Sequence, residues 1–118
     1  MKSKEYVRGT IKTIVLKLLS ENKKMYGYEI SQRVKQLSNG DIELTYGALY
    51  PILYKLENEK LLVTTSEVVD SRARKYYSLT PQGKKLAKVK VSELQRFTET
   101  LAMILRPVSP DTNLILGQ

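Results

Sequence analysis

The ten residues from Arg74 to Gly83, RKYYSLTPQG, constrain the fold most, because a strand must end and a helix must begin within them. Tyr76 and Tyr77 favour an extended strand, whose successive side chains point to opposite faces. Thr80 can cap a helix, since its hydroxyl can accept a hydrogen bond from a first-turn amide, and Pro81 suits the first helical position. The segment therefore predicts a strand that leads directly into a helix.

The predicted helix that follows runs from Pro81 to Leu105, a length of about 37 Å at 1.5 Å per residue. Its apolar side chains recur at the three-four-three spacing of a helix pair, at Leu94, Phe97, Leu101 and Ile104. A small domain cannot bury so long a seam by itself. We expect residues 81–106 to form a dimerisation helix of a homodimer, and residues 107–118 to form a flexible tail.

Upstream, helical periodicity predicts three helices, over residues 5–21, 29–37 and 46–60. The second is expected to end near Ser38-Asn39-Gly40, and Thr45 is a suitable cap for the third.

A β-hairpin is predicted next. Residues 61–69 are rich in β-branched types, residues 70–73 are expected to form the turn, and residues 75–79 the return strand. Three helices followed by a hairpin indicate an α+β, mostly α fold: a winged helix-turn-helix domain over residues 1–80, with the long helix attached to it.

The net charge of +8 is concentrated in two parts of the chain. Residues 1–24 contain seven Lys or Arg against two acids, and residues 70–90 contain seven against one, whereas the remainder is slightly acidic. If the fold places these two segments on one side, they form a binding surface for a polyanion such as double-stranded DNA. The alternative is an ordinary basic surface of a small protein.

Composition argues against several classes of protein. The chain has no Cys and no His, which excludes disulfides, thiolate zinc sites and His-based catalytic triads, and the three Asp residues lie far apart in sequence. We therefore expect no enzyme activity, no metal and no cofactor. No apolar run approaches the roughly 18 residues of a membrane span, and the N-terminus lacks the apolar core of a signal peptide, so a cytoplasmic protein without a membrane partner is expected.

The third predicted helix has a neutral outer face. At 100° per residue its tyrosines and small residues lie opposite its leucines. As a recognition helix in the major groove it would use its N-terminal part, and the hairpin cations would neutralise phosphates. The predicted DNA-binding residues are Thr45, Tyr46, Gly47, Tyr50, Tyr54, Lys55, Arg72, Arg74 and Lys75. For Tyr50 and Tyr54 the alternative is packing against the hairpin or the second helix; for the cations it is plain solvation.

Five motifs in order resemble the PadR-like transcriptional regulators, in their short form with one C-terminal helix. They are Arg8-Gly9, Tyr26 to Ile30, Gly47 to Pro51, Leu56-Glu57 leading to Leu61, and Arg74 to Gly83. The resemblance covers about residues 5–105. It implies a winged helix-turn-helix repressor that dimerises through the last helix and the first, with phenolic acids or planar hydrophobic molecules as effectors in some members.

Two departures from the family pattern stand out. The family usually has Gly at the position of Lys60, and a Lys in the left-handed conformation costs roughly 1 to 2 kcal/mol, so the third helix is expected to end differently here. The hairpin tip, Asp70 to Ala73, lacks the Gly and Pro often found there.

The sequence thus predicts a homodimeric regulator, a repressor by resemblance, that binds a pseudo-palindromic operator and responds to a small hydrophobic effector beside Leu94, Phe97, Leu101 and Ile104. Two alternatives stay open. The tyrosine-rich face could bind a protein partner, which would make the chain an interaction module, or the chain could bind DNA without sequence preference as an architectural protein.

Overall fold

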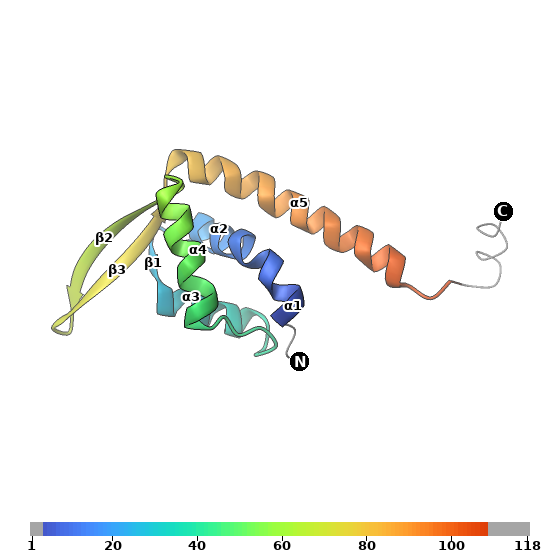
Figure 1. Ribbon diagram of the computed structural model, residues 1–118, viewed down its shortest axis with the longest axis horizontal. Coiled ribbons are helices and arrows are strands. Elements are labelled where there is room, and N and C mark those ends of the chain that lie inside the picture. The colour runs from blue at the N-terminus through green and yellow to red at the C-terminus, as the bar shows by residue number, and fades with distance from the viewer. Residues whose placement is uncertain (1–3, 109–118) are drawn as a thin grey trace.

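The computed structural model describes residues 4–108 and confirms the expected α+β, mostly helical winged-helix fold (Figure 1). The elements in chain order are α1 (Lys4–Val7), the 3-10 helix η1 (Arg8–Thr10), α2 (Ile11–Glu21), β1 (Met25–Tyr26), α3 (Gly27–Leu37), α4 (Tyr46–Asn58), β2 (Leu62–Val69), β3 (Arg72–Leu79) and α5 (Pro81–Leu105). The final helix has the predicted bounds. The first predicted helix is divided at η1, which contains Gly9.

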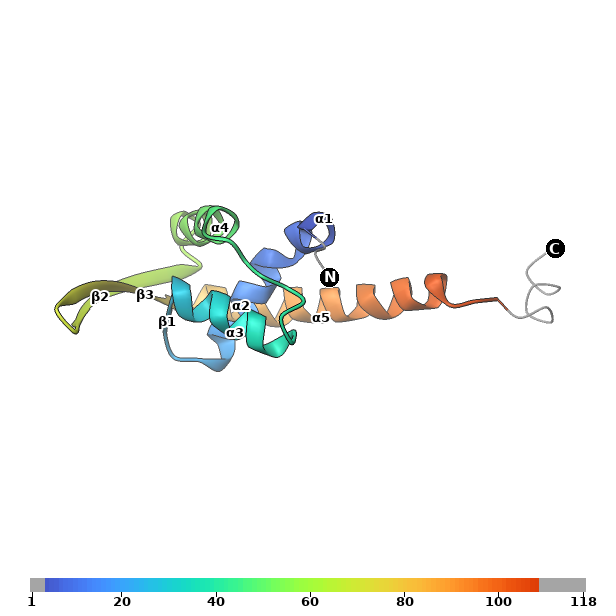
Figure 2. The ribbon, with the colours of Figure 1, turned by 90° about the horizontal axis from the view of Figure 1, so that it is seen from below.

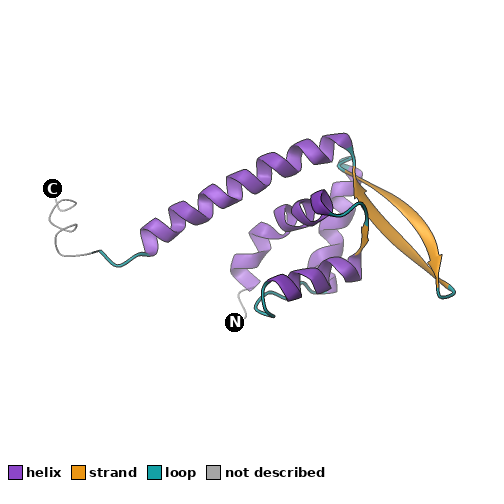
Figure 3. Cartoon of the chain, turned by 180° about the vertical axis from the view of Figure 1, so that it is seen from behind, coloured by secondary structure: helices purple, strands orange, loops and turns teal. Residues whose placement is uncertain are grey.

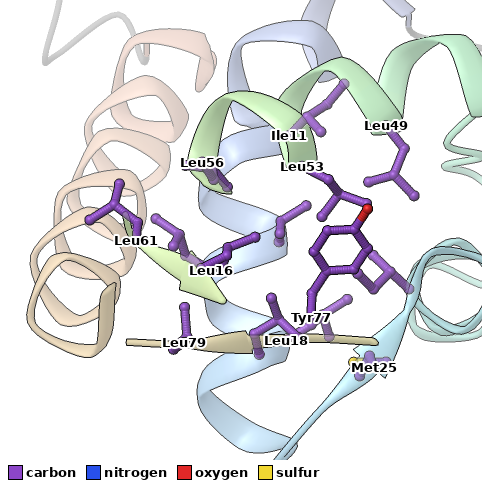
Figure 4. Close-up of a cluster of buried hydrophobic side chains, with 14 of the residues drawn as sticks. Ile11, Leu16, Leu18, Met25, Leu49, Leu53, Leu56, Leu61, Tyr77 and Leu79 are labelled. Atoms are coloured by element: carbon purple, nitrogen blue, oxygen red, sulfur yellow. The ribbon is translucent and has the colours of Figure 1, made fainter. Parts of the chain in front are cut away.

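A single apolar core holds α2, α3 and α4 against the sheet. Its largest fully buried side chains come from all of these elements, namely Val15, Leu16, Leu18, Ile30, Leu49, Leu53, Leu56 and Leu62. Tyr77 of β3 is buried among them, with its hydroxyl directed toward Leu53 of α4 (Figure 4). Its neighbour Tyr76 is half-buried on the other face of the strand, so the expected division of the two tyrosines is confirmed. Within residues 4–108, no helix is both long and apolar enough to cross a membrane.

The sheet has three antiparallel strands in the order β1-β3-β2. The hairpin of β2 and β3 runs in register from Leu62 opposite Leu79 to Val69 opposite Arg72, and it projects away from the helices (Figure 3). The sequence did not predict β1, in which Met25 lies opposite Tyr77. Two residues are too few to show a strand alternation, so only pairing with β3 reveals this strand.

The hairpin turn is tighter than predicted. Asp70 and Ser71 alone form it, with φ angles of 50° and 65°, and Arg72 and Ala73 already belong to β3. Two consecutive residues with positive φ are the pattern of a type I′ turn, whose twist matches that of the strands it joins. The expected four-residue turn over 70–73 is therefore wrong, because Asp and Ser adopt here the conformation that Gly usually supplies.

Helix α4, the third helix predicted from the sequence, ends with Lys60 in the left-handed conformation, which was not expected from the sequence. Lys60 adopts the left-handed conformation, with a φ of 62°. Its N–H donates to the carbonyl of Glu57 at 3.0 Å, and the N–H of Leu61 donates to the carbonyl of Leu56 at 3.0 Å. This pair of hydrogen bonds is the Schellman motif that usually places Gly at this position. The buried side chain of Leu61 holds the motif in place despite the strain of Lys60.

Thr80 joins α5 to the end of α4, as its predicted capping role requires. Its hydroxyl accepts from the N–H of Gly83 at 3.0 Å and donates to the carbonyl of Lys60 at 2.9 Å. Gly83 is needed here, because a Cβ on it would lie 2.1 Å from the carbonyl oxygen of Leu61. The start of α5 is thereby fixed against the end of α4.

The strain at Lys60 predicts that Lys60→Gly stabilises the protein. Glycine adopts positive φ without a Cβ clash, although its freedom in the unfolded chain offsets part of the gain, so we expect the free energy of unfolding to rise by about 0.5 to 1 kcal/mol. Urea denaturation followed by circular dichroism measures the change. Lys60→Ala keeps the strain and serves as the control. Equal stability of the two variants would show that φ at this position has no energetic cost.

Candidate nucleic-acid interface

A groove of about 510 Å³ lies between α4 and the hairpin. It is lined by Tyr26, Gly27, Tyr46, Tyr50, Tyr54, Ala73, Arg74, Lys75 and Tyr77. The fold thus brings together five of the nine predicted DNA-binding residues: Tyr46, Tyr50, Tyr54, Arg74 and Lys75. The other four lie outside this groove.

The N-terminal part of α4 presents its aromatic side chains to solvent. Thr45 caps the helix as predicted, since its hydroxyl accepts from the N–H of Ala48 at 3.2 Å. Tyr46 is 74% exposed and Tyr54 is 65% exposed. The rings of Tyr46 and Tyr50 stack with their centroids 3.9 Å apart. From Tyr46 to Tyr54, the exposed face of α4 is therefore aromatic and neutral, as the sequence predicted.

Tyr50 differs from its two neighbours because it is half-buried. A Cβ on Gly27 would lie 2.1 Å from the Tyr50 hydroxyl oxygen, so this tyrosine packs against the start of α3. Burial, together with the nearby Tyr46 and Tyr77 hydroxyls, raises the pKa of Tyr50 above its ordinary value. Tyr50 therefore combines packing on α3 with an edge in the groove, and it keeps its proton at neutral pH.

Gly47 occupies an open position on the same helix. A Cβ there would have no atom within 4 Å, so neither the ring of Pro51 nor any other packing requires a glycine. Pro51 is itself exposed inside α4, and its missing N–H leaves one turn of the helix without a hydrogen bond. The absence of a side chain at Gly47 instead leaves helix backbone accessible from outside.

The alternation of β3 divides the hairpin cations between two faces. Arg74 lies over the ring of Tyr26, with its guanidinium carbon 4.6 Å from the ring centroid. A hydrogen bond with Tyr76 raises the pKa of this guanidinium further above its ordinary value. Lys75 points the other way, toward α4, where its ammonium lies 3.3 Å from a carboxylate oxygen of Glu57. The sequence grouped these cations, but the strand separates them.

Arg72 and Lys55 remain exposed outside the groove. Arg72 follows the turn, near the tip of the hairpin, and Lys55 lies on the outer side of α4. Neither Arg72 nor Arg74 takes part in an ion pair with another residue of the range 4–108. The positive charge of both arginines is therefore available to a ligand.

Sequence reasoning missed part of this surface. Tyr26 lines the groove and packs edge-on against Tyr76, with 5.5 Å between centroids. Tyr28 is 61% exposed at the start of α3. Lys24 forms an ion pair with Glu67 and lies over the Tyr76 ring, 4.7 Å from its centroid. Lys24, Tyr26 and Tyr28 all lie in or beside β1. A prediction of this strand would have indicated that this part of the chain reaches the hairpin.

The two basic segments of the sequence meet only in part. Lys24, at the end of the first segment, reaches the hairpin, but α1 lies at the far end of α2, away from β2 and β3 (Figure 1). The start of the chain therefore lies away from the hairpin, and the positive charge at the groove comes from Arg74 and Lys75 of β3.

The predicted seam of α5 is largely uncovered in the single chain. Only Gly83 and Ala87 of this helix are buried, and its C-terminal half extends past the helical body (Figure 2). Phe97 is 58% exposed and Ile104 is 71% exposed, and Leu101 is exposed as well.

Leu94 differs from the rest of the seam, because it lines a second cavity of about 370 Å³ between α2, the end of α3 and α5. Ile14, Leu18, Val34 and Val91 also contribute to this apolar cavity, and Lys17 and Gln95 contribute polar side chains. Among residues 4–108, no group of three or more acidic, His or Cys side chains is placed to hold a metal ion. The tail from residue 109 onward lies outside the described residues.

Comparison with known proteins agrees with this geometry. Residues 15–89 match the transcriptional regulator PadR-like family. The transcriptional regulator Rv3488 of Mycobacterium tuberculosis is 33% identical over 99 residues, which cover 84% of this chain and 85% of the relative.

Solved structures show the same arrangement. A transcriptional regulator from Clostridium thermocellum has a TM-score of 0.77 and 27% identity, covering 86% of this chain and 99% of that one. A PadR family transcriptional regulator from Eggerthella lenta has a TM-score of 0.69 and 28% identity, covering 86% and 87%. These relatives are described as transcriptional regulators, and none as an enzyme. The chain therefore belongs to the PadR-like family of transcriptional regulators, and the expectation that it is not an enzyme is confirmed.

Proposed function

We propose that this regulator is a homodimeric repressor that binds a pseudo-palindromic operator, with α4 in the major groove and the hairpin on the phosphate backbone. The observation that carries the proposal is the groove that is lined both by the exposed tyrosines of α4 and by the cations Arg74 and Lys75 of β3. A helix in the major groove reads base edges through its N-terminal residues, and cations beside it bind phosphates without reading sequence.

The roles of the groove residues follow from their exposure. Tyr46 and Tyr54 contact bases and sugars, since both are exposed on α4. Arg72 and Arg74 contact phosphates, since neither forms an ion pair with another of the described residues, 4–108. Lys75 lies in the groove, but its charge is partly satisfied by Glu57. Thr45 positions Tyr46 by capping the helix, and it is itself exposed to solvent.

Dimerisation through α5 is supported by its uncovered apolar seam. Phe97, Leu101 and Ile104 share one side of the helix and would lose their exposure against a second copy. Tyr6 on α1 is 74% exposed, which fits the participation of the first helix that the family resemblance implies.

The cavity beside Leu94 is the candidate effector site. Its apolar walls suit a small hydrophobic or phenolic molecule, and the ammonium of Lys17, which also lines the cavity, is 2.7 Å from Glu21. Because α2, α3 and α5 all line the cavity, a ligand there could change the angle between the dimerisation helix and the DNA-binding elements.

DNA binding is tested by fluorescence anisotropy, with DNA from upstream of the protein's own coding sequence against scrambled DNA at several salt concentrations. Neutralisation of about six phosphates gives a slope near −5 in a plot of log affinity against log salt. A flat slope or no binding would favour the protein-interaction module. The same slope without sequence preference would favour an architectural role.

Arg74→Ala and Tyr46→Ala should separate affinity from specificity. Loss of a phosphate contact weakens both DNAs similarly and lowers the salt slope by about one unit, whereas loss of a base-reading side chain mainly lowers the preference for operator DNA. The same anisotropy titrations measure both quantities. An equal loss of preference in the two variants would contradict this division of roles.

Gly47→Ala should weaken DNA binding without harming the fold. Alanine is the better helix former by up to about 1 kcal/mol, and the new methyl group meets no atom of the protein, so stability should stay the same or rise. If DNA approaches the helix backbone here, operator affinity should fall at least about fivefold, because the methyl holds the two surfaces apart. Thermal denaturation and anisotropy are measured on the same samples. Unchanged affinity would place Gly47 outside the DNA contact.

Leu101→Glu should convert the dimer to a monomer. A carboxylate buried in the seam without a partner should weaken dimerisation by at least about 100-fold. Sedimentation velocity at micromolar concentration measures the change, and circular dichroism confirms that the helices persist. Met103→Glu is the matched control, because Met103 is an exposed apolar residue about 200° away on the same helix. A monomeric wild type, or loss of the dimer in both variants, would contradict dimerisation through the apolar side of α5 that contains Leu101.

A further inference from the structure

Glu57 connects the recognition helix to both strands of the hairpin. One carboxylate oxygen accepts a hydrogen bond from the Thr64 hydroxyl of β2 at 3.1 Å. The other lies 3.3 Å from the Lys75 ammonium of β3. Thr64 and Lys75 point to the same face of the hairpin, the face that also carries the buried Tyr77 opposite Thr64. One side chain thus holds three elements of the DNA-binding surface.

The position of Glu57 is not explained by its own helix. It is the penultimate residue of α4, where the negative end of the helix dipole disfavours a carboxylate. It is also only half-exposed. Glu59, two residues later, is exposed, and none of the ion pairs among residues 4–108 joins it to a hairpin cation. The contacts with Thr64 and Lys75 therefore compensate for an unfavourable site.

The ion pair with Glu57 also limits the availability of the Lys75 charge to a ligand. Partial burial lowers the pKa of Lys75, but the hydrogen bond and charge of Glu57 and the nearby Tyr77 outweigh it, so the pKa is raised overall. The ammonium also lies 5.5 Å from the centroid of the Tyr77 ring. Lys75 stays charged and is held toward α4, on the face of β3 opposite Arg74. Its charge is shared with a carboxylate at the place where a phosphate backbone would pass.

We propose that Glu57 is a specificity-determining residue that withholds the Lys75 charge from DNA phosphates and sets the hairpin against α4. The inference rests on the proposed function. Binding without sequence preference depends on the number of phosphates neutralised, so a cation already paired with a carboxylate contributes little to it. Contacts of Tyr46 and Tyr54 with bases depend instead on the geometry of α4. Glu57 thus lowers the affinity for DNA of any sequence and, by setting the hairpin against α4, supports the base contacts of Tyr46 and Tyr54 on which sequence preference depends.

The test compares Glu57→Gln, Glu59→Gln and the double variant Glu57→Gln with Lys75→Met by anisotropy on operator and scrambled DNA. Glutamine keeps an oxygen for Thr64 but removes the charge that holds Lys75. Glu57→Gln should steepen the salt slope by about 0.9 and strengthen scrambled-DNA binding about threefold or more at low salt, because Lys75 gains a phosphate. The operator preference should fall. The double variant should return to the wild-type slope.

Glu59→Gln is the matched control, because it removes the same charge from the same end of α4 without freeing a lysine. A response of Glu57→Gln no larger than that of Glu59→Gln would overturn the inference. So would an equal loss of affinity for both DNAs at unchanged slope, which is the result expected of a purely structural brace. Failure of the wild type to bind any duplex at low salt would instead remove the proposed function.

A second measurement tests the interaction of Glu57 with Lys75 in the absence of DNA. The pKa of Lys75, followed by NMR of its side chain, should fall toward its ordinary value in Glu57→Gln and stay unchanged in Glu59→Gln. An equal Lys75 pKa in the wild type and Glu57→Gln would overturn the inference even if the slopes differ. Thermal denaturation of each variant confirms that folded protein is being compared.

Discussion

The carbonyl of Leu61 is the point on which the arrangement of the molecule depends. It accepts the N–H of Thr80 at 3.0 Å, and it lies so close to Gly83 that only a glycine fits there. Thr80 also donates to the carbonyl of Lys60, so the end of α4, the start of β2, the end of β3 and the start of α5 meet within a few residues. Backbone hydrogen bonds at this junction set the direction of α5 relative to the recognition helix.

This junction fixes the start of α5, and the two halves of the helix have different surroundings. Near Gly83 and Ala87 the helix is buried against the body, whereas from Phe97 onward its apolar side chains are exposed. In the proposed dimer, the seam fixes the angle between two copies of α5, and the junction carries that angle to each α4. The spacing of the two half-sites on DNA would then follow from helix geometry, and a ligand in the cavity beside Leu94 would act on that same angle.

Local patterns predicted most of the fold, because caps and periodicity are encoded by neighbouring residues. Thr45, Thr80 and the bounds of α5 are examples. The features that the sequence did not predict depend on tertiary contacts. Strand β1 exists only through pairing with β3, and Lys60 is held in a strained conformation by the burial of Leu61. For the candidate site, the sequence indicated five residues that line the groove but not the directions of their side chains. The alternation of β3 sends Arg74 and Lys75 to opposite faces, and packing on Gly27 turns Tyr50 partly inward.

The chemistry of the groove favours discrimination over affinity. Arg74 and Lys75 are the cations that line it, and Lys75 is paired with Glu57, as Lys24 beside the hairpin is paired with Glu67. Its central surface is formed by neutral tyrosines, which gain little from phosphates but lose base and sugar contacts on the wrong sequence. With the proposed function, a regulator built in this way would bind bulk DNA weakly, because Arg72 and Arg74 are the hairpin cations that form no ion pair with another of the residues 4–108. It would therefore rely on two linked copies, whose combined contacts would make the operator the preferred site.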